Sequence, residues 1–423
     1  MSALTKKYSH WWDVTPPDFA LQPQLPHYAD IVIIGAGFAG ISTAYWLLRL
    51  VNKKRRKNLR IMVLDDGPYA AFRASGRMNG SVYLGSNRSA KAMKDAHGEK
   101  VARALYNYSN RNNRQLQELI SSGLPCDAEF NGGFRMASTA KEAKELDDSA
   151  KLLSSWGFHP ARFDHNESQH VMVVPYTKGS LFVPGEGMID PFAYCNKLAR
   201  ILRKNNIWVV YNTRVTKNSV ASDGNSCITL SNGHTITAGK VVHTTTQTVP
   251  CERVIEKIVY RREHAVRTQP LSSDLDDMPL PLMPIELGGG LDSVRMYDRS
   301  VIMTGGKVGL KRDPDLYNVN DTSYNERILG QLDNVMMHNF PITNHMEISH
   351  QWTYVETELE DCLPLMGELP DYAGHYVNIG HGRNKFGLAF LGARNIAEKI
   401  LRVKMSSPDE FKIFDPKRLT RGE

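Results

Sequence analysis

Cysteine is scarce in this chain and follows no pattern. The 423 residues include five cysteines, an odd number without a C-x-x-C pair: Cys126, Cys195, Cys227, Cys251 and Cys362. Such usage argues against a disulfide framework and against a zinc site built from paired thiolates. We therefore predict no metal site, and a protein of a reducing compartment, the cytoplasm.

A hydrophobic segment that could cross a membrane is missing as well. Only residues 31–51 approach the roughly 20 apolar residues that a span needs. Three glycines in the first half of this segment, followed by a helical pattern, indicate instead a buried strand, a turn and a helix. The N-terminus also lacks the apolar core of a secretory signal. We predict no transmembrane segment.

Charge of neither sign dominates. There are 52 lysines and arginines against 45 aspartates and glutamates, which gives a net charge of +7 and a pI near 9.0. This excess is typical of a soluble basic protein, and an anionic partner such as nucleic acid is the less favoured alternative. The five consecutive basic residues at 53–57 have the same two interpretations, a solvated loop or a nucleic-acid contact. Repeats and low-complexity tracts are absent, and the length suits two domains.

What the chain does contain is a glycine motif. Residues 30–34 form an apolar strand, and Gly35, Gly37 and Gly40 follow at G-x-G-x-x-G spacing. The first glycine permits a tight turn, the second lets a pyrophosphate approach the backbone, and the third lets the helix pack closely on the strand. The free amides and positive dipole end of the following helix would then bind the diphosphate.

A second apolar strand, residues 60–64, ends at Asp65 and Asp66. Asp65 lies 25 positions after Gly40, close to the roughly 20 expected for a carboxylate that binds a ribose hydroxyl. Strand, glycine motif, helix, strand and acid in this order predict a dinucleotide-binding unit, and a turn without ligand is the alternative. Because no basic residue directly follows the acids, FAD or NAD is favoured over NADP.

The rest of the chain alternates between two kinds of segment. Helical patterns cover residues 98–122, 140–156 and 190–205, and Asp190-Pro191 is a clear helix start. Strand patterns then follow, including a hairpin with Asn232-Gly233 at its turn. The alternation predicts antiparallel strands over 250–355, interrupted by one helix near 328–336. The expected strands are residues 132–136, 207–211, 240–244, 254–261, 301–304 and 347–354.

A second strand–glycine–helix turn stands near the end of the chain. Residues 376–379 form a strand, Gly380-His381-Gly382 follow, and a helix is expected from about 386 to 403. This turn suggests another helix N-terminus directed at the same ligand.

These residues together resemble the D-amino-acid-oxidase-like (DAO) superfamily of FAD-dependent oxidoreductases. Within it they are most similar to the branch of glycine oxidase, sarcosine oxidase and gamma-glutamylputrescine oxidase. The aromatic N-terminal arm and His350-Gln351-Trp352 look most like the last of these. The resemblance covers residues 28–403 and rests on 33–40, 74–77, Val215, 240–242, Asp361 with Pro364 and Gly367, and 380–382.

The resemblance implies a mixed α/β and α+β fold. A Rossmann-like FAD-binding domain, discontinuous in sequence, would accompany a second substrate domain built on a mainly antiparallel sheet. The implied division is an N-terminal arm (1–27), the FAD-binding domain (28–112, 188–248 and 356–404), the substrate domain (113–187 and 249–355) and a polar C-terminal tail (405–423).

FAD is the implied cofactor, bound without a covalent link because Cys362 does not stand in the attachment pattern of sarcosine oxidase. The implied FAD-binding residues belong to the two glycine turns, the acids after the second strand, the small-residue segment that follows them, and the strand ends near 215 and 244. They are Gly35, Gly37, Phe38, Ala39, Gly40, Asp65, Asp66, Ser75, Gly76, Arg77, Asn79, Val215, Thr244, Thr245, Gly380, Gly382, Arg383, Asn384, Lys385 and Phe386.

The chain departs from the family pattern in three places. The A-T pair of the family is replaced at residues 244–245, and its S-G-R-N-G-G is altered at 75–80. Glycine-oxidase-like members carry an arginine, which binds the substrate carboxylate, five residues before the equivalent of Asp361. Glu356 stands there instead. A glutamate favours an amine or amide-bearing substrate; the alternative is a surface glutamate, with the clamp supplied by Arg295, Arg299 or Arg383.

Flavin amine oxidation needs few side chains, because the cofactor accepts a hydride at N5 from the carbon beside a neutral amine and the imine then hydrolyses. We expect His381 as a polar group beside the flavin and Lys307 as a positive charge that assists oxygen chemistry. A turn residue and a solvated lysine are the respective alternatives. The expected substrate-binding residues are Trp352, Tyr354 and Glu356.

The leading hypothesis is an FAD-dependent oxidase or dehydrogenase that acts on the C–N bond of a small amine or N-substituted amino acid. Oxygen or another electron acceptor would reoxidise the flavin. One alternative moves the same chemistry to a glycine-type substituent on a modified nucleobase in DNA or tRNA. Another, of a different class, is a non-catalytic flavin-binding protein.

Overall fold

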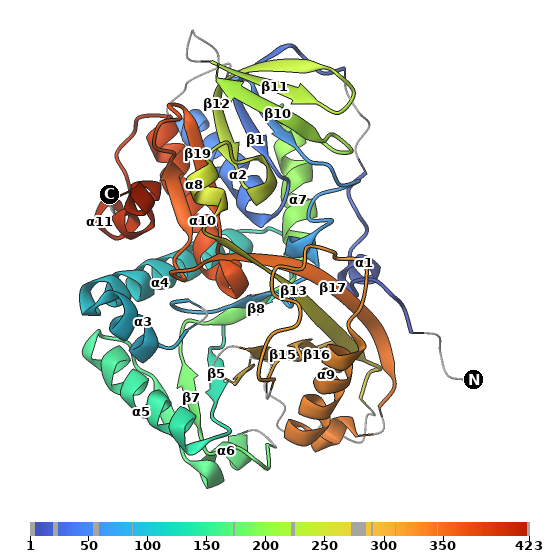
Figure 1. The fold of residues 1–423 in the computed structure, drawn as a ribbon, viewed down its shortest axis with the longest axis vertical. Helices are drawn as coiled ribbons and strands as arrows, with labels where there is room; N and C mark the ends of the chain where they lie inside the picture. The colour runs from blue at the N-terminus through green and yellow to red at the C-terminus, as the bar shows by residue number, and fades with distance from the viewer. Residues whose placement is uncertain are drawn as a thin grey trace.

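The computed structural model is shown in Figure 1. It describes residues 5–19, 24–53, 59–86, 88–171, 174–220, 225–271, 285–288, 291–308, 310–344 and 346–420. The basic residues at 54–57, on which the nucleic-acid hypothesis partly depends, lie outside the described residues. So do parts of the N-terminal arm (1–4 and 20–23) and the last residues of the C-terminal tail (421–423).

The first sheet contains the glycine motif. Its central strand β1 (Tyr28–Ile34) pairs in parallel with β2 (Ile61–Leu64) on one side and β12 (Thr235–His243) on the other. Because β1 and β2 are covered on both faces, they consist almost wholly of apolar residues. The remaining strands are β9 (Trp208–Val210), β10 (Val215–Val220), β11 (Ser226–Leu230), β18 (Leu365–Glu368) and β19 (His375–Ile379).

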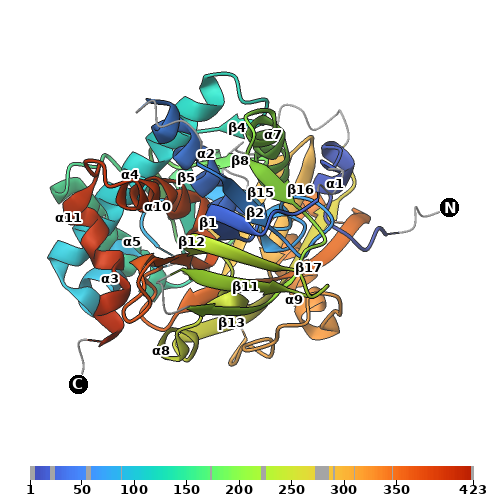
Figure 2. The same cartoon turned by 90° about the horizontal axis from the view of Figure 1, so that it is seen from above.

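Helices α2 (Phe38–Lys53), α7 (Pro191–Lys204) and α10 (Lys385–Ile400) pack beside the first sheet, and α4 (Glu99–Ser121) packs on α10 (Figures 1 and 2). The predicted start of α7 is confirmed, since the Asp190 side chain accepts hydrogen bonds from the amides of Phe192 and Ala193. The helices predicted near 98–122, 140–156 and 386–403 are also present, the second as α5 (Ala140–Ser155).

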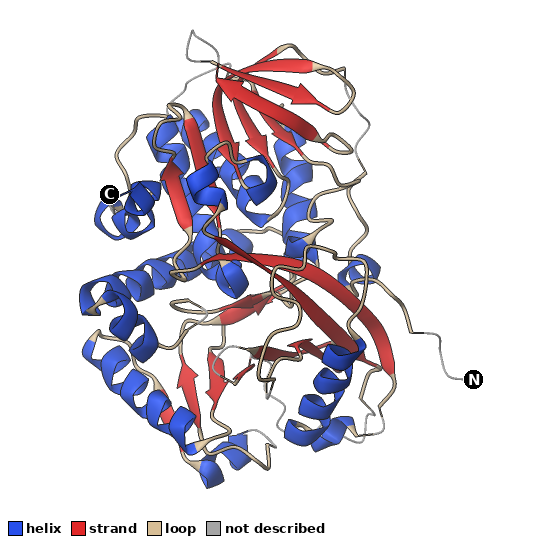
Figure 3. Cartoon of the chain, viewed as in Figure 1, coloured by secondary structure: helices blue, strands red, loops and turns tan. Residues whose placement is uncertain are grey.

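The second sheet is mainly antiparallel, as predicted (Figure 3). Its long strands β13 (Ile258–Thr268) and β17 (Ile348–Leu359) pair along most of their length, and α9 (Glu326–Asn339) packs on β13 and β16. The sheet continues through β16 (Ser300–Gly305), β15 (Asp292–Tyr297), β14 (Ile285–Leu287), β5 (Gly133–Met136), β7 (Ser180–Val183) and β6 (Ala161–Phe163).

Short elements join the two sheets. A three-stranded sheet consists of β3 (Ser81–Val82), β8 (Gly187–Ile189) and β4 (Ala128–Glu129). Helix α3 (Ala90–His97) packs on α4 and α5, and helix α6 (His165–Val171) contacts β6. Within the described ranges, no helix is both long and apolar enough to cross a bilayer.

Three predictions were wrong in detail. Residues 254–255 belong to helix α8 (Glu252–Ile255) rather than to a strand. The N-terminal arm is not extended throughout, because residues 11–14 form the short helix α1 (Trp11–Val14) with Trp11 fully buried. The C-terminal segment is not a polar tail. Phe411, in α11 (Pro408–Phe411), and Phe414 are buried against Tyr108 of α4, which fixes the segment on the body.

Two buried histidines face each other inside the first sheet. Nε2 of His243 lies 3.2 Å from Nδ1 of His375, and Ser226 Oγ lies 2.7 Å from Nε2 of His375. Burial lowers the pKa of His243 to about 3, with a smaller contribution from His375. Burial likewise lowers the pKa of His375 to about 4, with a contribution from Lys240.

This pair predicts acid-sensitive stability. The folded pKa values lie below the unfolded value of 6.5, so only the unfolded chain takes up these protons as the pH falls. The two histidines therefore do not reduce the free energy of unfolding above pH 6.5. Below it, the free energy of unfolding decreases as the pH falls toward 4 and 3. Each histidine contributes at most about 1.4 kcal/mol per pH unit. Unfolding curves of a His243→Gln/His375→Gln variant across this range should show a shallower pH dependence. An unchanged slope would contradict this assignment.

Candidate functional site

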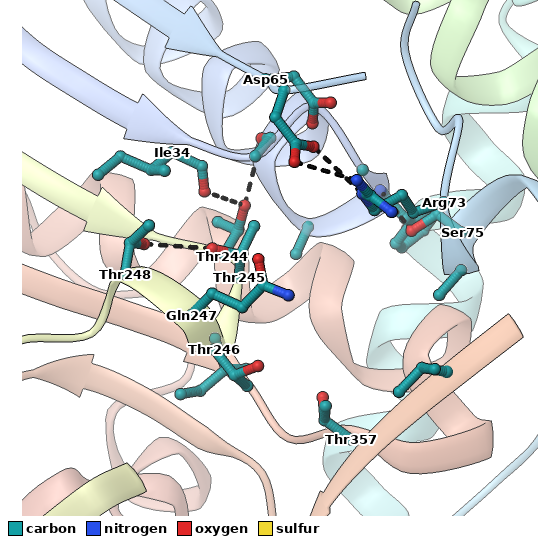
Figure 4. Close-up of a pocket in the computed structure, with 18 of the residues that line it drawn as sticks. Ile34, Asp65, Arg73, Ser75, Thr244, Thr245, Thr246, Gln247, Thr248 and Thr357 are labelled. Atoms are coloured by element: carbon teal, nitrogen blue, oxygen red, sulfur yellow. Dashed lines mark hydrogen bonds and ion pairs between the residues drawn. The ribbon is translucent and has the colours of Figure 1, made fainter. Parts of the chain in front are cut away.

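A cavity of about 410 Å³ lies at the carboxyl edge of the first sheet. Its walls come from the turn after β1, the ends of β2, β12 and β19, and strands β13 and β17 of the second sheet (Figure 4). We call it the main cavity. The carboxyl ends of parallel strands meet at one edge, which is where open α/β sheets bind ligands.

The glycine turn shapes one end of the main cavity. Gly35 has φ +110°, a left-handed conformation that a side chain would strain. A Cβ at Gly40 would lie 1.9 Å from the carbonyl oxygen of Gly35, so the third glycine allows α2 to approach β1. Gly37 and Ala39 line the cavity, and no acceptor for their amides occurs among the described residues. The start of α2 is therefore open to an anionic group.

The acid after β2 is held by the same turn. Asp65 accepts hydrogen bonds from the amides of Ala36 (2.6 Å) and Gly67 (2.8 Å). Burial raises the pKa of Asp65 to about 6, although these two hydrogen bonds oppose the shift. Asp66 also lines the cavity and pairs with Arg73 at 3.1 Å. Both acids thus lie beside the glycine turn, Asp65 as part of its hydrogen bonding.

The segment after β12 forms a hydroxyl-rich wall. Thr244 donates from Oγ1 to the carbonyl oxygen of Ile34 at 2.8 Å, and the Oγ1 atoms of Thr245 and Thr248 are 3.1 Å apart (Figure 4). Thr246 and Gln247 complete this wall. The sequence prediction included residues 244–245 and missed 246–248. Since these follow directly on a parallel strand, the rule that strand ends share one edge would have found them.

The second strand–glycine–helix turn also lines the main cavity. Gly380 has φ +75°, and Gly380, His381 and Lys385 line the wall. Nε2 of His381 lies 2.8 Å from Oδ1 of Asn378, and burial, helped by Lys385, lowers the pKa of His381 to about 3. The imidazole is therefore neutral. Both glycine turns do lie at one cavity.

Other predicted cofactor residues are not among those that line the main cavity. The guanidinium of Arg77 donates to the carbonyl oxygens of Phe72 and Thr353 and pairs with Asp321 at 3.1 Å. Asn79 donates to Ser293 Oγ at 2.7 Å. These contacts join the first sheet's loops to the second sheet. Gly40, Gly76, Gly382, Arg383, Asn384 and Phe386 are likewise absent from the wall, whereas Phe38, Ser75 and Val215 are part of it.

The candidate substrate residues lie on a neighbouring part of the second sheet. Trp352 is buried and donates from Nε1 to the carbonyl oxygen of Arg77 at 2.6 Å. Tyr354 and Glu356 line a smaller cavity. The ammonium of Lys307 is bound to Glu263 (2.7 Å) and Asp313 (3.0 Å), outside the main cavity. The structure therefore does not bring Lys307 together with His381.

Several wall residues were missed. Arg73, Tyr260, Val355 and Thr357 come from segments with no motif, and the folded chain alone brings them to the cavity. Strand alternation explains the last two, because Val355 and Thr357 flank Glu356 on β17 and point to the opposite face from it.

The comparisons with known proteins agree with the family resemblance that the sequence indicates. The family model "FAD dependent oxidoreductase" (DAO) matches residues 30–399. "Probable oxidoreductase OrdL" of Haemophilus influenzae is 22% identical over 420 residues, which is 93% of this chain and 88% of that protein. The tRNA 5-methylaminomethyl-2-thiouridine biosynthesis bifunctional protein MnmC of Shewanella amazonensis is 27% identical over 215 residues, which is 50% of this chain but 29% of that protein.

The fold has a close counterpart among solved structures. The crystal structure of glycine oxidase from Geobacillus kaustophilus superposes with a TM-score of 0.76 at 18% identity, over 94% of this chain and 100% of that one. At this identity the likeness concerns the fold, which is the predicted combination of a Rossmann-like unit and an antiparallel sheet.

Proposed function

The chain belongs to the DAO family of FAD-dependent oxidoreductases, and from this we propose that it oxidises a C–N bond of a small amine or N-substituted amino acid. FAD, bound without a covalent link, supplies the hydride acceptor. The observation that carries the proposal is the main cavity, which is lined by two glycine turns that are far apart in sequence.

The residues of the main cavity fit FAD. The open amides of Gly37 and Ala39 at the start of α2 suit a pyrophosphate, and Gly37 has no side chain to obstruct it. Asp65 and Asp66 lie where ribose hydroxyls are usually bound in such folds. Lys385, at the start of α10, adds a cation to the wall. Together these groups suit a ligand that has an anionic pyrophosphate and ribose hydroxyls.

The chain's own contribution to the reaction is to orient and to exclude water. Tyr260, Val355 and Thr357 of the second sheet form part of the wall. The backbone bridge between Glu358 and His381 fixes this wall against the second turn. Since His381 is neutral, it can accept or donate a hydrogen bond without carrying charge. No triad is needed for such chemistry.

Lys385 should strengthen FAD binding. No hydrogen-bond or ion-pair partner of its ammonium occurs among the described residues, and burial lowers its pKa. A Lys385→Met variant is expected to bind FAD about tenfold more weakly, the loss of one charge-assisted hydrogen bond. Fluorescence titration of the flavin-free protein with FAD measures this. The exposed Lys144→Met should leave the affinity unchanged, and equal affinities for all three proteins would contradict the assignment.

The test of the proposed function is anaerobic mixing of the purified holoenzyme with a panel of amines, N-substituted amino acids and amino acids. Bleaching of the oxidised flavin by an amine, with release of a carbonyl product, is the expected result. Hydrogen peroxide formed on admission of air would identify oxygen as the electron acceptor. A flavin that no C–N compound reduces would overturn the proposal and favour a non-catalytic flavin-binding protein.

A second candidate is removal of a glycine-type substituent from a modified nucleobase. The similarity to MnmC, whose name refers to the biosynthesis of a modified tRNA uridine, supports it. The match covers 29% of that protein, and the basic residues at 54–57 lie outside the described residues. Salt-dependent binding of tRNA with reduction of the flavin would favour this candidate, and no binding at low salt would dismiss it.

A further inference from the structure

A small cavity lies between residues 78–83 and the second sheet. Its volume is about 10 Å³, enough for about one water molecule. Charged and phenolic side chains from five different segments converge on it: Tyr83, Glu286, Asp292, Tyr354, Glu356 and Arg383. We call it the acidic cavity, because three of these six groups are carboxylates.

Two carboxylate oxygens of the acidic cavity lack hydrogen-bond donors. Oε1 of Glu356 and Oδ2 of Asp292 are buried without a partner in the described structure. The other oxygen of each carboxylate has a partner. Oε2 of Glu356 lies 3.8 Å from Nε of Arg383, and Oδ1 of Asp292 accepts from the Lys307 amide at 2.8 Å. Buried acceptors without donors are costly, so two at one cavity indicate a missing donor group.

The nearby cations are already engaged. Nη2 of Arg383 donates to Glu263 at 2.9 Å, and Nζ of Lys307 donates to the other oxygen of Glu263 at 2.7 Å. Glu286 pairs with Arg135 at 3.1 Å. Two further charges interact electrostatically with Glu356. The negative charge of Glu358 raises the pKa of Glu356, and Glu356 in turn raises the pKa of Lys385, against the effect of burial. Glu263 takes up most of the local positive charge, which leaves Glu356 and Asp292 undercompensated.

Burial has the expected effect on both acids. Desolvation, reinforced by Glu263, raises the pKa of Glu356 to about 7. Desolvation also raises the pKa of Asp292 to about 6. At neutral pH these groups hold protons for part of the time, and a cation with N–H donors would replace those protons.

We propose that the acidic cavity binds the protonated amino group of a cationic amine, which donates to Oε1 of Glu356 and Oδ2 of Asp292. A primary ammonium group has three N–H donors and is about the size of the water molecule for which the cavity has room. The substrate class is then an alkylamine without a carboxylate beside its nitrogen, and transfer of one ammonium proton to Glu356 would give the neutral amine from which hydride leaves. Only the identification of this amine as the substrate rests on the proposed function.

An α-amino acid would fit the acidic cavity poorly. Its carboxylate would lie beside Glu286, Asp292 and Glu356, and like charges repel strongly in a buried site. The one guanidinium in the wall, that of Arg383, is already hydrogen-bonded to Glu263. The acidic cavity therefore selects for positive charge and against a neighbouring negative one.

The test uses a cation that cannot be oxidised. The carbon that bears nitrogen in tert-butylamine has no hydrogen, so its ammonium form can bind without turnover, and pivalate is an anion that carries the same tert-butyl group. Calorimetric titration of the holoenzyme should show binding of tert-butylammonium and none of pivalate. Binding should release protons near neutral pH, detected as a dependence of the heat on the ionisation enthalpy of the buffer.

Glu356→Gln should weaken tert-butylammonium binding about tenfold or more and reduce the proton release per bound cation, because only Asp292 then has a proton to lose. Glu347→Gln, at an exposed position just before β17, removes the same charge and should change neither. If Glu356 had only a structural role, the number of protons released per bound cation would be the same in the Glu356→Gln variant as in the unchanged protein. Equal binding by both variants, or binding of pivalate in place of the cation, would overturn the inference.

The two proposals fail separately. If amines bleach the flavin but tert-butylammonium does not bind, the acidic cavity is not an ammonium site and the proposed function stands. If tert-butylammonium binds through Glu356 and no amine bleaches the flavin, the cavity is a cation site and the proposed function is wrong.

Discussion

A Gly40→Ala variant is expected to lose its flavin. The added Cβ would lie 1.9 Å from the Gly35 carbonyl oxygen and 2.9 Å from Thr244 Oγ1. The first contact is with backbone, so α2 must move away from β1, and the open amides of Gly37 and Ala39 move with it. If two charge-assisted hydrogen bonds are lost at about 1.5 kcal/mol each, FAD affinity falls roughly 100-fold.

Flavin content and FAD titration measure this loss. The free energy of unfolding should fall as well, by about 1–3 kcal/mol, because overpacking strains the junction of helix and strand. Gly330→Ala is the matched control. Gly330 is in the exposed part of α9, with no atom within 4 Å of the added methyl group. This control should retain its flavin and gain about 0.5–1 kcal/mol from helix propensity. A yellow Gly40→Ala protein with normal stability would refute the account of the glycine turn.

The second large effect is expected at Arg135. This side chain in β5 is buried and donates to both carboxylate oxygens of Glu186, at 2.8 and 2.7 Å. Its Nε lies 3.1 Å from Glu286, and it donates to the carbonyl oxygen of Leu84. Arg135→Met leaves two buried carboxylates without their cation. The free energy of unfolding should fall by about 3–5 kcal/mol.

Chemical denaturation measures the loss, and a second variant separates its causes. Arg135→Met with Glu186→Gln and Glu286→Gln removes the stranded charges as well and should recover part of the stability. Lys412→Met breaks an exposed ion pair with Asp409 and should leave the unfolding curve unchanged. A loss below about 1 kcal/mol in Arg135→Met would show that the two acids find other partners.

The element order was largely predictable because its signals are local. Three glycines at fixed spacing and a capping pair such as Asp190-Pro191 determine a turn or a helix start within a few residues, and periodicity determines the rest. The predicted boundaries of helices and strands were wrong where a local pattern was ambiguous. Residues 254–255 are apolar and β-branched, as in a strand, yet they form α8. Phe411 and Phe414 were missed as buried residues because most of their neighbours are polar.

The walls of the cavities were less predictable, because they join residues far apart in sequence. Arg77 and Asn79 belong to a motif, yet neither lines the main cavity, and the folded chain uses both to connect loops of the first sheet to the second sheet. The sequence singled out Glu356 by type and position, but not its unpartnered oxygen or its neighbour Asp292.

The sequence by itself determined the dinucleotide-binding unit, the antiparallel second sheet and the family. Each depends on spacing along one segment or on the order of segments. Only the tertiary structure decided which side chains face the two cavities and which carboxylates remain without donors. The burial of these groups exists only after β13 has paired with β17 and β16, and β16 with β15, which joins strands far apart in the sequence.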